Sequence, residues 1–318
     1  MDVKKIFLTC LISTCGILSI QAQKTGIMIM AHGGSDLWNN LVVKAAQPLT
    51  TNYPVAYAWG MADANTIQHA VYELEAKGVT NIIAIPLFIS THSFIIRQTE
   101  YLLGLRDSLA DAPMPPMDHS SGSHGTHNIT NSEHSSTHHN HGTTHKKFEL
   151  SPLKIKAKII LTPALDDNDI VAQILNDRIA ELSIEPENET VILVAHGPND
   201  EDDNKQWVLN LESLSEKIQS LQKKNGIGYK QIFALTVRDD ADKDIFDQAK
   251  EQLRSLVRQA DHFGKVIVVP VFLSSGGREH AVKERLEGLT FKWNGKTLLP
   301  DNRLSDFLTN SVKDALKK

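Results

Sequence analysis

The chain has 318 residues, of which 41% are hydrophobic and 22% are charged, and its formal net charge is −5. This length suits two domains of ordinary size, and the mildly acidic balance excludes the basic surface of a typical nucleic-acid-binding protein. Both cysteines, Cys10 and Cys15, lie near the N-terminus. The remaining chain therefore has no thiolate for a disulfide, a metal site or a nucleophile.

Residues 1–23 are predicted to form a signal peptide. Lys4 and Lys5 precede an apolar run from Ile6 to Ile20, and Ala22 marks a small-residue cleavage region. The run is too short for a comfortable membrane span. We therefore expect export, to the periplasm if the cell is Gram-negative, and no stable membrane span after cleavage. A retained anchor is the alternative.

The rest of the chain is an internal repeat in which strands alternate with amphipathic helices. Strands that are apolar throughout, alternating with such helices, indicate parallel sheets covered on both faces. We predict an α/β fold of two similar doubly wound lobes, residues 24–185 and 186–318, each with a parallel four-stranded sheet. The strands are expected near residues 26–31, 55–59, 82–88, 155–161, 190–195, 231–237, 266–272 and 290–298.

Comparison of the two halves shows an insertion in the first, at about residues 110–150. Gly104 and Pro163 are 59 positions apart, whereas their counterparts Gly288 and Pro300 are 12 apart, so the insertion is 59 − 12 = 47 residues long. It holds eight of the 14 histidines and almost no apolar residues. We predict a disordered surface loop, which either collects metal ions or binds them only incidentally.

Four histidines outside this tract follow strands of the predicted sheets. His32 and His196 end the first strand of each lobe, in the repeated sequence Ala-His-Gly. His92 lies six residues after Pro86, and His280 lies ten after Pro270, each beyond the third strand of its lobe. Because ligands bind outside the carboxyl ends of parallel strands, these four imidazoles are candidate metal ligands and bases.

Several charged residues accompany the histidines. Glu279 adjoins His280, and Glu284 would lie one helical turn further if a helix begins near Arg278. These carboxylates could orient imidazoles or accept protons. Five further acidic residues could either act in the same way or stabilise the N-termini of the helices that follow them. The five are Asp36, Asp63, Asp200, Asp239 and Asp240. Arg238 could bind a substrate carboxylate or form a surface ion pair.

The Ala-His-Gly turns at 31–33 and 195–197, with a Pro-x-Phe strand and a following histidine in each lobe, resemble the class II chelatases. The resemblance is strongest to the CbiX-type sirohydrochlorin cobaltochelatases, which also carry histidine-rich segments. It implies ATP-independent insertion of a divalent metal into a tetrapyrrole bound in the cleft between the lobes. No nucleotide-binding glycine loop is present, in keeping with that expectation.

The resemblance carries over to His196 as the His-Gly histidine and to His280 as the histidine after the third strand, with His32 and His92 as their first-lobe equivalents. The different spacings in the two lobes leave open which pair is active. The expected substrates are Co²⁺, or else Ni²⁺ or Fe²⁺, and sirohydrochlorin or a related tetrapyrrole. The alternative is a non-catalytic exported protein that binds the metal or the macrocycle. A monomer is plausible, although the sequence leaves the oligomeric state open.

Overall fold

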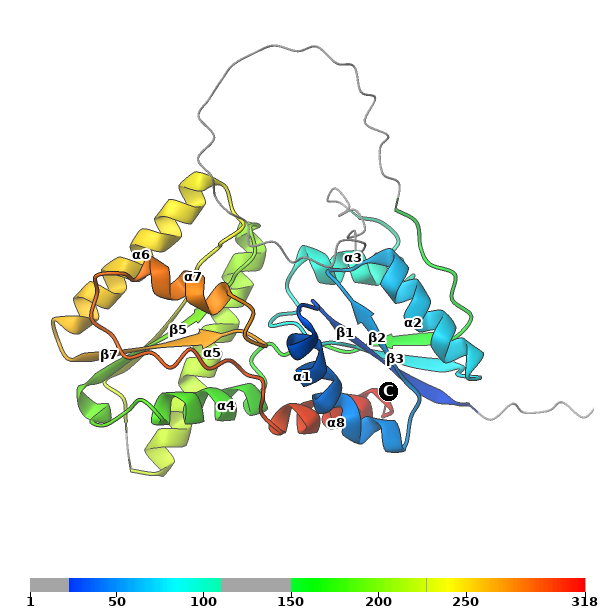
Figure 1. The fold of residues 1–318 in the computed structure, drawn as a ribbon, viewed down its shortest axis with the longest axis horizontal. Helices are drawn as coiled ribbons and strands as arrows, with labels where there is room; N and C mark the ends of the chain where they lie inside the picture. The colour runs from blue at the N-terminus through cyan, green and yellow to red at the C-terminus, as the bar shows by residue number, and fades with distance from the viewer. Residues whose placement is uncertain (1–22, 110–149, 227, 318) are drawn as a thin grey trace, which may run out of the picture.

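A computed structural model describes residues 23–109, 150–226 and 228–317 of the protein. All but the last residue of the predicted signal peptide, and nearly all of the histidine-rich insertion, lie outside these described residues. Two sheets with flanking helices form two lobes (Figure 1). Within the described part of the chain, no helix combines the length and the apolar character that a membrane crossing requires.

The first sheet has four parallel strands in the order β2-β1-β3-β4. The even-numbered side chains of β1 point to one face and the odd-numbered ones to the other, and nearly all are buried. This explains why the strands are apolar throughout. The elements are β1 (Thr25–Ala31), α1 (Asp36–Ala46), β2 (Val55–Trp59), α2 (Ala64–Ala76), β3 (Asn81–Pro86), α3 (Phe94–Leu102), β4 (Lys158–Leu161) and α4 (Asp169–Ala180), with a 3₁₀ turn at 47–51.

The second sheet repeats this arrangement with three parallel strands in the order β6-β5-β7. The α/β fold with two parallel sheets is therefore confirmed. The elements are β5 (Glu189–Ala195), α5 (Glu201–Lys224), β6 (Gln231–Thr236), α6 (Lys243–Asp261), β7 (Lys265–Val271), α7 (Arg278–Arg285) and α8 (Arg303–Ala315), with a 3₁₀ turn at 186–188.

The prediction of a fourth strand near residues 290–298 is wrong. Only Lys292 pairs with β7, in a single bridge opposite Ile267. The chain then turns at Asn294 and Gly295, where Gly295 has a φ of +67° and the Asn294 side chain accepts a hydrogen bond from the Lys296 N–H. This polar turn interrupts the backbone pairing with β7. Pairing resumes at Leu298, whose N–H donates a hydrogen bond to the carbonyl oxygen of Phe272, the residue after β7.

Helices cover both faces of each sheet. Helices α2 and α3 pack on one face of the first sheet, and α6 and α7 pack on the corresponding face of the second. The other faces of both sheets contribute to a single apolar cluster that also contains residues of α1, α4, α5 and α8. The two lobes therefore share one continuous hydrophobic core.

The last helix of each half crosses to the other lobe. Helix α4 follows β4 of the first sheet but packs against α5 and β7, whereas α8 ends the chain but packs against α1 and β3 (Figure 1). The apolar side of α8 comprises Leu304, Phe307, Leu308 and Val312, which recur at helical spacing. The predicted sequence boundary near residue 185 thus lies between two units whose packing is interleaved.

Candidate functional site

The first strands of the two lobes end in the same histidine turn. β1 is followed by His32 and Gly33, and β5 by His196 and Gly197, with glycine φ angles of +78° and +74°. In both turns the imidazole Nδ1 lies 2.7 Å from the carbonyl oxygen of the following glycine. A carbonyl only accepts hydrogen bonds, so Nδ1 carries the proton and Nε2 is the nitrogen left for chemistry.

The first-lobe turn leaves the His32 side chain exposed. The Gly34 N–H donates to the Asn39 side chain at 2.9 Å, so Asn39 bridges the turn. Ser35 caps α1, and Asp36 occupies its first turn. Asp36 thus serves the helix N-terminus rather than the imidazole, and Nε2 of His32 faces no carboxylate among the described residues.

The second-lobe turn holds its histidine differently. The His196 side chain is 25% exposed, and its Nε2 lies 3.1 Å from Oδ2 of Asp240, close enough for charge attraction although its direction is poor for a straight hydrogen bond. The close approach of His196, supported by hydrogen bonds from Arg278, keeps the pKa of the Asp240 carboxyl well below its ordinary value. Both ring nitrogens of His196 therefore face acceptor oxygens, one on Gly197 and one on Asp240.

The roles of Asp239 and Asp240 differ from the helix caps that we favoured from the sequence. α6 begins only at Lys243, so neither residue caps it. Asp239 forms a buried ion pair with Arg285, and Asp240 pairs with Arg278 through bonds of 3.0 and 3.2 Å. In the first lobe the helix begins sooner after β2, and Asp63 does cap α2.

Arg238 fixes the turn that holds His196, and its guanidinium is already bonded within the protein instead of being available to a substrate carboxylate. Its N–H donates to the His196 carbonyl at 2.6 Å, and its guanidinium bonds to the Pro198 carbonyl and to Glu201. The residue is buried and has a φ of +49°, which is uncommon outside glycine. Asp200 caps α5, in agreement with the helix-terminal alternative for that residue.

His92 lies on a loop that is anchored on both sides. Its N–H donates to Ser90 at 3.1 Å, and its carbonyl accepts a 2.6 Å hydrogen bond from the indole of Trp207 on α5. The preceding Thr91 donates to Asp166 through both its N–H and its hydroxyl, at 2.7 and 2.6 Å. The backbone is thereby fixed, while the His92 side chain stays exposed.

His280 and Glu284 both lie on α7, one helical turn apart, as expected if the helix begins at Arg278. The His280 side chain is 76% exposed, and its Nε2 is 4.0 Å from Glu279. Glu279 itself is buried, because its carboxylate accepts the N–H groups of Gly276 and Gly277. Glu284 is exposed. Glu279 therefore stabilises the turn before α7.

The four histidines do not form a preassembled metal centre within the described ranges. Nowhere in those ranges do three His, Cys, Asp or Glu side chains gather around a point that could hold a metal ion. The proposal of four histidine ligands therefore stays a prediction. The two lobes nevertheless meet near these turns, since a Cβ added at Gly276 would lie 3.6 Å from Cδ1 of Trp38 on α1.

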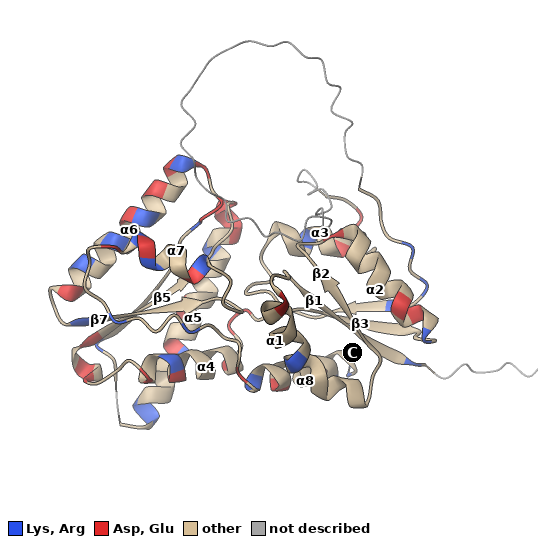
Figure 2. Ribbon diagram, viewed as in Figure 1, with Lys and Arg blue, Asp and Glu red and all other residues tan. Residues whose placement is uncertain are grey.

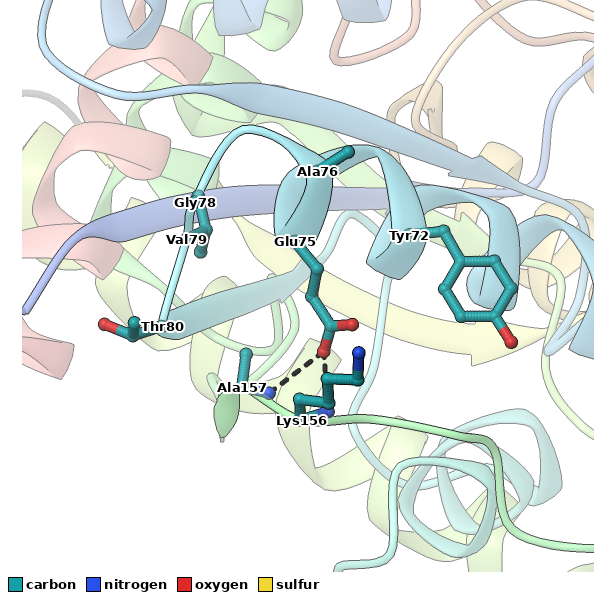
Figure 3. A pocket seen from close by; sticks show the side chains of 8 residues that line it. All are labelled: Tyr72, Glu75, Ala76, Gly78, Val79, Thr80, Lys156 and Ala157. Atoms are coloured by element: carbon teal, nitrogen blue, oxygen red, sulfur yellow. Dashed lines mark hydrogen bonds between the residues drawn. The ribbon is translucent and has the colours of Figure 1, made fainter.

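Three cavities among the described residues have linings that include none of the four histidines. Figure 3 shows one beside α2, where the Glu75 carboxylate accepts the N–H groups of Lys156 and Ala157 at 2.6 and 3.0 Å. Thr80, at the start of β3, also lines this cavity, which places it at the opposite end of the sheet from the histidines. Glu75 is thus committed to holding the segment before β4.

Comparisons with known proteins agree with the chelatase-like architecture. The CbiX family model matches residues 26–182. Among solved structures, the chain is similar to SirB from Bacillus subtilis with Fe³⁺, with 12% identity, coverage of 92% of this chain and 96% of that one, and a TM-score of 0.57. It is also similar to the sirohydrochlorin chelatase SirB from Bacillus subtilis subspecies spizizenii in complex with cobalt, with 10% identity, coverage of 93% and 96%, and a TM-score of 0.55. At these identities the likeness shows the fold, and a comparison with curated proteins found no match.

Proposed function

We propose that the chain is a class II chelatase of the CbiX type, which inserts a divalent metal ion into sirohydrochlorin or a closely related tetrapyrrole. The match of the CbiX family model to residues 26–182 supports this proposal. Co²⁺ is the metal that we favour, with Ni²⁺ and Fe²⁺ as the other candidates. The metal is a substrate in this reaction, and no nucleotide is consumed. Residues 1–23 support a location outside the cytoplasm, in the periplasm of a Gram-negative cell.

We place the chemistry in the first lobe, at His32 and His92. The observation that carries this choice is that the family model matches the lobe holding these two histidines and stops before His196. The geometry supports the same choice. Nε2 of His32 is exposed and faces no carboxylate in the described chain, whereas both ring nitrogens of His196 face acceptors.

Metal insertion requires two roles of these residues, binding of the metal ion and acceptance of protons. A neutral imidazole is a good ligand for Co²⁺, Ni²⁺ and Fe²⁺, and the locked Nδ1 of His32 presents Nε2 as the ligand atom. Metal insertion also releases two pyrrole N–H protons, which a second imidazole or solvent must accept. His92 is suited to this second role because its backbone is fixed while its side chain remains exposed.

The surface beside His32 offers an apolar contact for a flat macrocycle. Leu37, in the first turn of α1, is 73% exposed, although neighbouring Trp38 is buried. An isolated exposed leucine is common, but this one lies five residues after a candidate ligand and near the junction of the two lobes. The macrocycle would cover Leu37, and the removal of this apolar surface from water would favour binding.

Metallation of sirohydrochlorin tests the proposal. Residues 24–318 are mixed anaerobically with metal-free sirohydrochlorin, then Co²⁺, Ni²⁺ or Fe²⁺ is added, and the absorption spectrum of the macrocycle is followed. We expect acceleration over the protein-free reaction, with Co²⁺ the fastest. Binding of the macrocycle without any acceleration would instead establish the alternative function, a non-catalytic exported carrier.

A further inference from the structure

Two basic side chains of the second lobe, Arg278 and His196, converge on one carboxylate. Arg278 grips Asp240 with both terminal nitrogens, at 3.0 and 3.2 Å, and Nε2 of His196 approaches the same carboxylate at 3.1 Å. A guanidinium that holds a carboxylate through two nitrogens is the arrangement that proteins use to recognise carboxylate ligands, and here an imidazole nitrogen lies beside it. Here the carboxylate is supplied by the chain itself.

This internal carboxylate is not otherwise committed. The Asp240 side chain is 56% exposed and caps no helix, and Arg278 is 48% exposed. By contrast, the neighbouring pair Asp239 and Arg285 is buried. Exposed pairs contribute little to stability, so exchanging one carboxylate for another at Arg278 costs little. The Asp240 side chain can leave while its backbone stays anchored through the hydrogen bond from Asn199.

The cluster also lies beside the proposed metal site. Arg278 directly follows Gly276 and Gly277, and Gly276 lies against Trp38 on α1 of the first lobe. The preceding turn from β1 carries His32. Figure 2 marks several charged residues on α7, the helix that begins at Arg278. A macrocycle held over His32 would therefore bring its peripheral side chains toward this cluster.

We propose that Arg278 and His196 form a receptor for a carboxylate side chain of the macrocycle, and that Asp240 occupies this receptor until the substrate arrives. The inference rests on the proposed function, since sirohydrochlorin carries acetate and propionate groups around its ring. The second copy of the histidine turn would then bind the substrate's periphery, while the first copy handles the metal. Arg278 and His196 are specificity-determining residues in this account.

The receptor predicts that changes at Arg278 and at Asp240 alter the affinity for the macrocycle in opposite directions. Removing Arg278 should weaken macrocycle binding, whereas neutralising Asp240 should strengthen it, because Asp240 competes with the substrate for the same guanidinium. A purely structural ion pair predicts that both changes weaken binding or that neither does. Arg278→Lys should fall between Arg278→Gln and the wild type, since lysine keeps the charge but lacks the two-pronged geometry.

The test is equilibrium binding of metal-free sirohydrochlorin, followed by fluorescence in the presence of a metal chelator, so that insertion plays no part. We expect Arg278→Gln to raise the Kd about tenfold or more and Asp240→Asn to lower it several-fold, while the double variant resembles Arg278→Gln. Lys283→Gln, an exposed change of the same charge on the same helix, is the control and should leave the Kd nearly unchanged.

The outcomes separate this inference from the proposed function. If the wild type binds but Arg278→Gln binds equally well, or if Lys283→Gln weakens binding as much, the receptor is refuted while the metal chemistry of the first lobe stands. The receptor is also refuted if Asp240→Asn weakens binding. If the wild type does not bind sirohydrochlorin at all, both proposals fall.

Discussion

The indole Nε1 of Trp207, on α5 of the second lobe, donates a 2.6 Å hydrogen bond to the carbonyl oxygen of His92 in the first lobe. A reciprocal contact joins Trp38 of the first lobe to Gly276 of the second. In both cases the helix that follows a histidine turn reaches the loop after the third strand of the other lobe. The two lobes thus position each other's candidate histidines.

Trp207→Phe should impair metal insertion. The change keeps an aromatic ring but removes the N–H donor, and so releases one anchor of the His92 loop. We expect a loss of about 1 kcal/mol in the free energy of unfolding and a several-fold fall in kcat. Trp293→Phe makes the same chemical change at a half-buried site away from His92 and should leave kcat unaltered. Equal effects of the two variants would argue against a positioning role for Trp207.

The glycines of the two histidine turns should differ in their tolerance of a side chain. At Gly197, alanine must adopt a positive φ and its Cβ would collide with Thr236, whereas at Gly33 the nearest atom is the Trp59 Cβ at 3.4 Å. We expect Gly197→Ala to cost about 2–4 kcal/mol of stability and Gly33→Ala about 1–2 kcal/mol. Urea denaturation measures both, and a larger loss for Gly33→Ala would contradict the geometry.

The ion pair between Arg97 on α3 and Asp203 on α5 should contribute to the junction of the lobes. Its two bonds are 2.7 and 3.0 Å long, and both side chains are largely shielded from water. Asp203→Asn should lower the free energy of unfolding by about 1–3 kcal/mol. A double-mutant cycle with Arg97→Gln isolates the pair, because Arg97 has other interactions as well. A coupling energy near zero would show that the pair contributes nothing.

The buried carboxylate of Glu189 should make stability depend on pH. Burial alone raises the pKa of Glu189, but bonds from Lys292, Ser183 and the Ile184 N–H outweigh it, so that the pKa lies below its ordinary value of 4.5. A lowered folded-state pKa adds stability above the ordinary value, and that stability is lost as the pH falls below 4.5.

Glu189→Gln provides the comparison for this pH effect. The variant should be less stable than the wild type at neutral pH, and the difference should shrink as the pH is lowered from 5 through the acid range, as chemical denaturation at each pH would show. A difference that stays constant over this range would mean that Glu189 does not carry the effect.

The strand positions and the histidines at strand ends could be predicted from the sequence, because buried parallel strands leave an unmistakable apolar run and the Ala-His-Gly turn occurs twice. Lys292 shows why the eighth strand could not: the internal repeat suggests a strand near residues 290–298, but Asn294 and Gly295 impose a turn, and only Lys292 pairs with β7. At Asn294 and Gly295 the preference for a turn outweighs the tendency of the flanking residues to continue the strand.

The crossing of α4 and α8 could not be predicted for a different reason. Residues such as Phe307 and Leu308 show which face of α8 is buried but not which sheet receives it. The contacts of Asp240 with His196 and Arg278 could not be predicted, because an acidic residue just after a strand normally caps the next helix, as Asp63 does. Only the later start of α6 frees Asp240 to meet His196.

The most direct test of the central claim compares the rate of Co²⁺ insertion into sirohydrochlorin by His32→Ala and His196→Ala. If the first lobe handles the metal, His32→Ala should lower kcat by about 100-fold or more. His196→Ala should keep kcat within a few-fold of the wild type and raise the KM for the macrocycle instead. A loss of kcat in His196→Ala together with a fully active His32→Ala would contradict the account and place the metal in the second lobe.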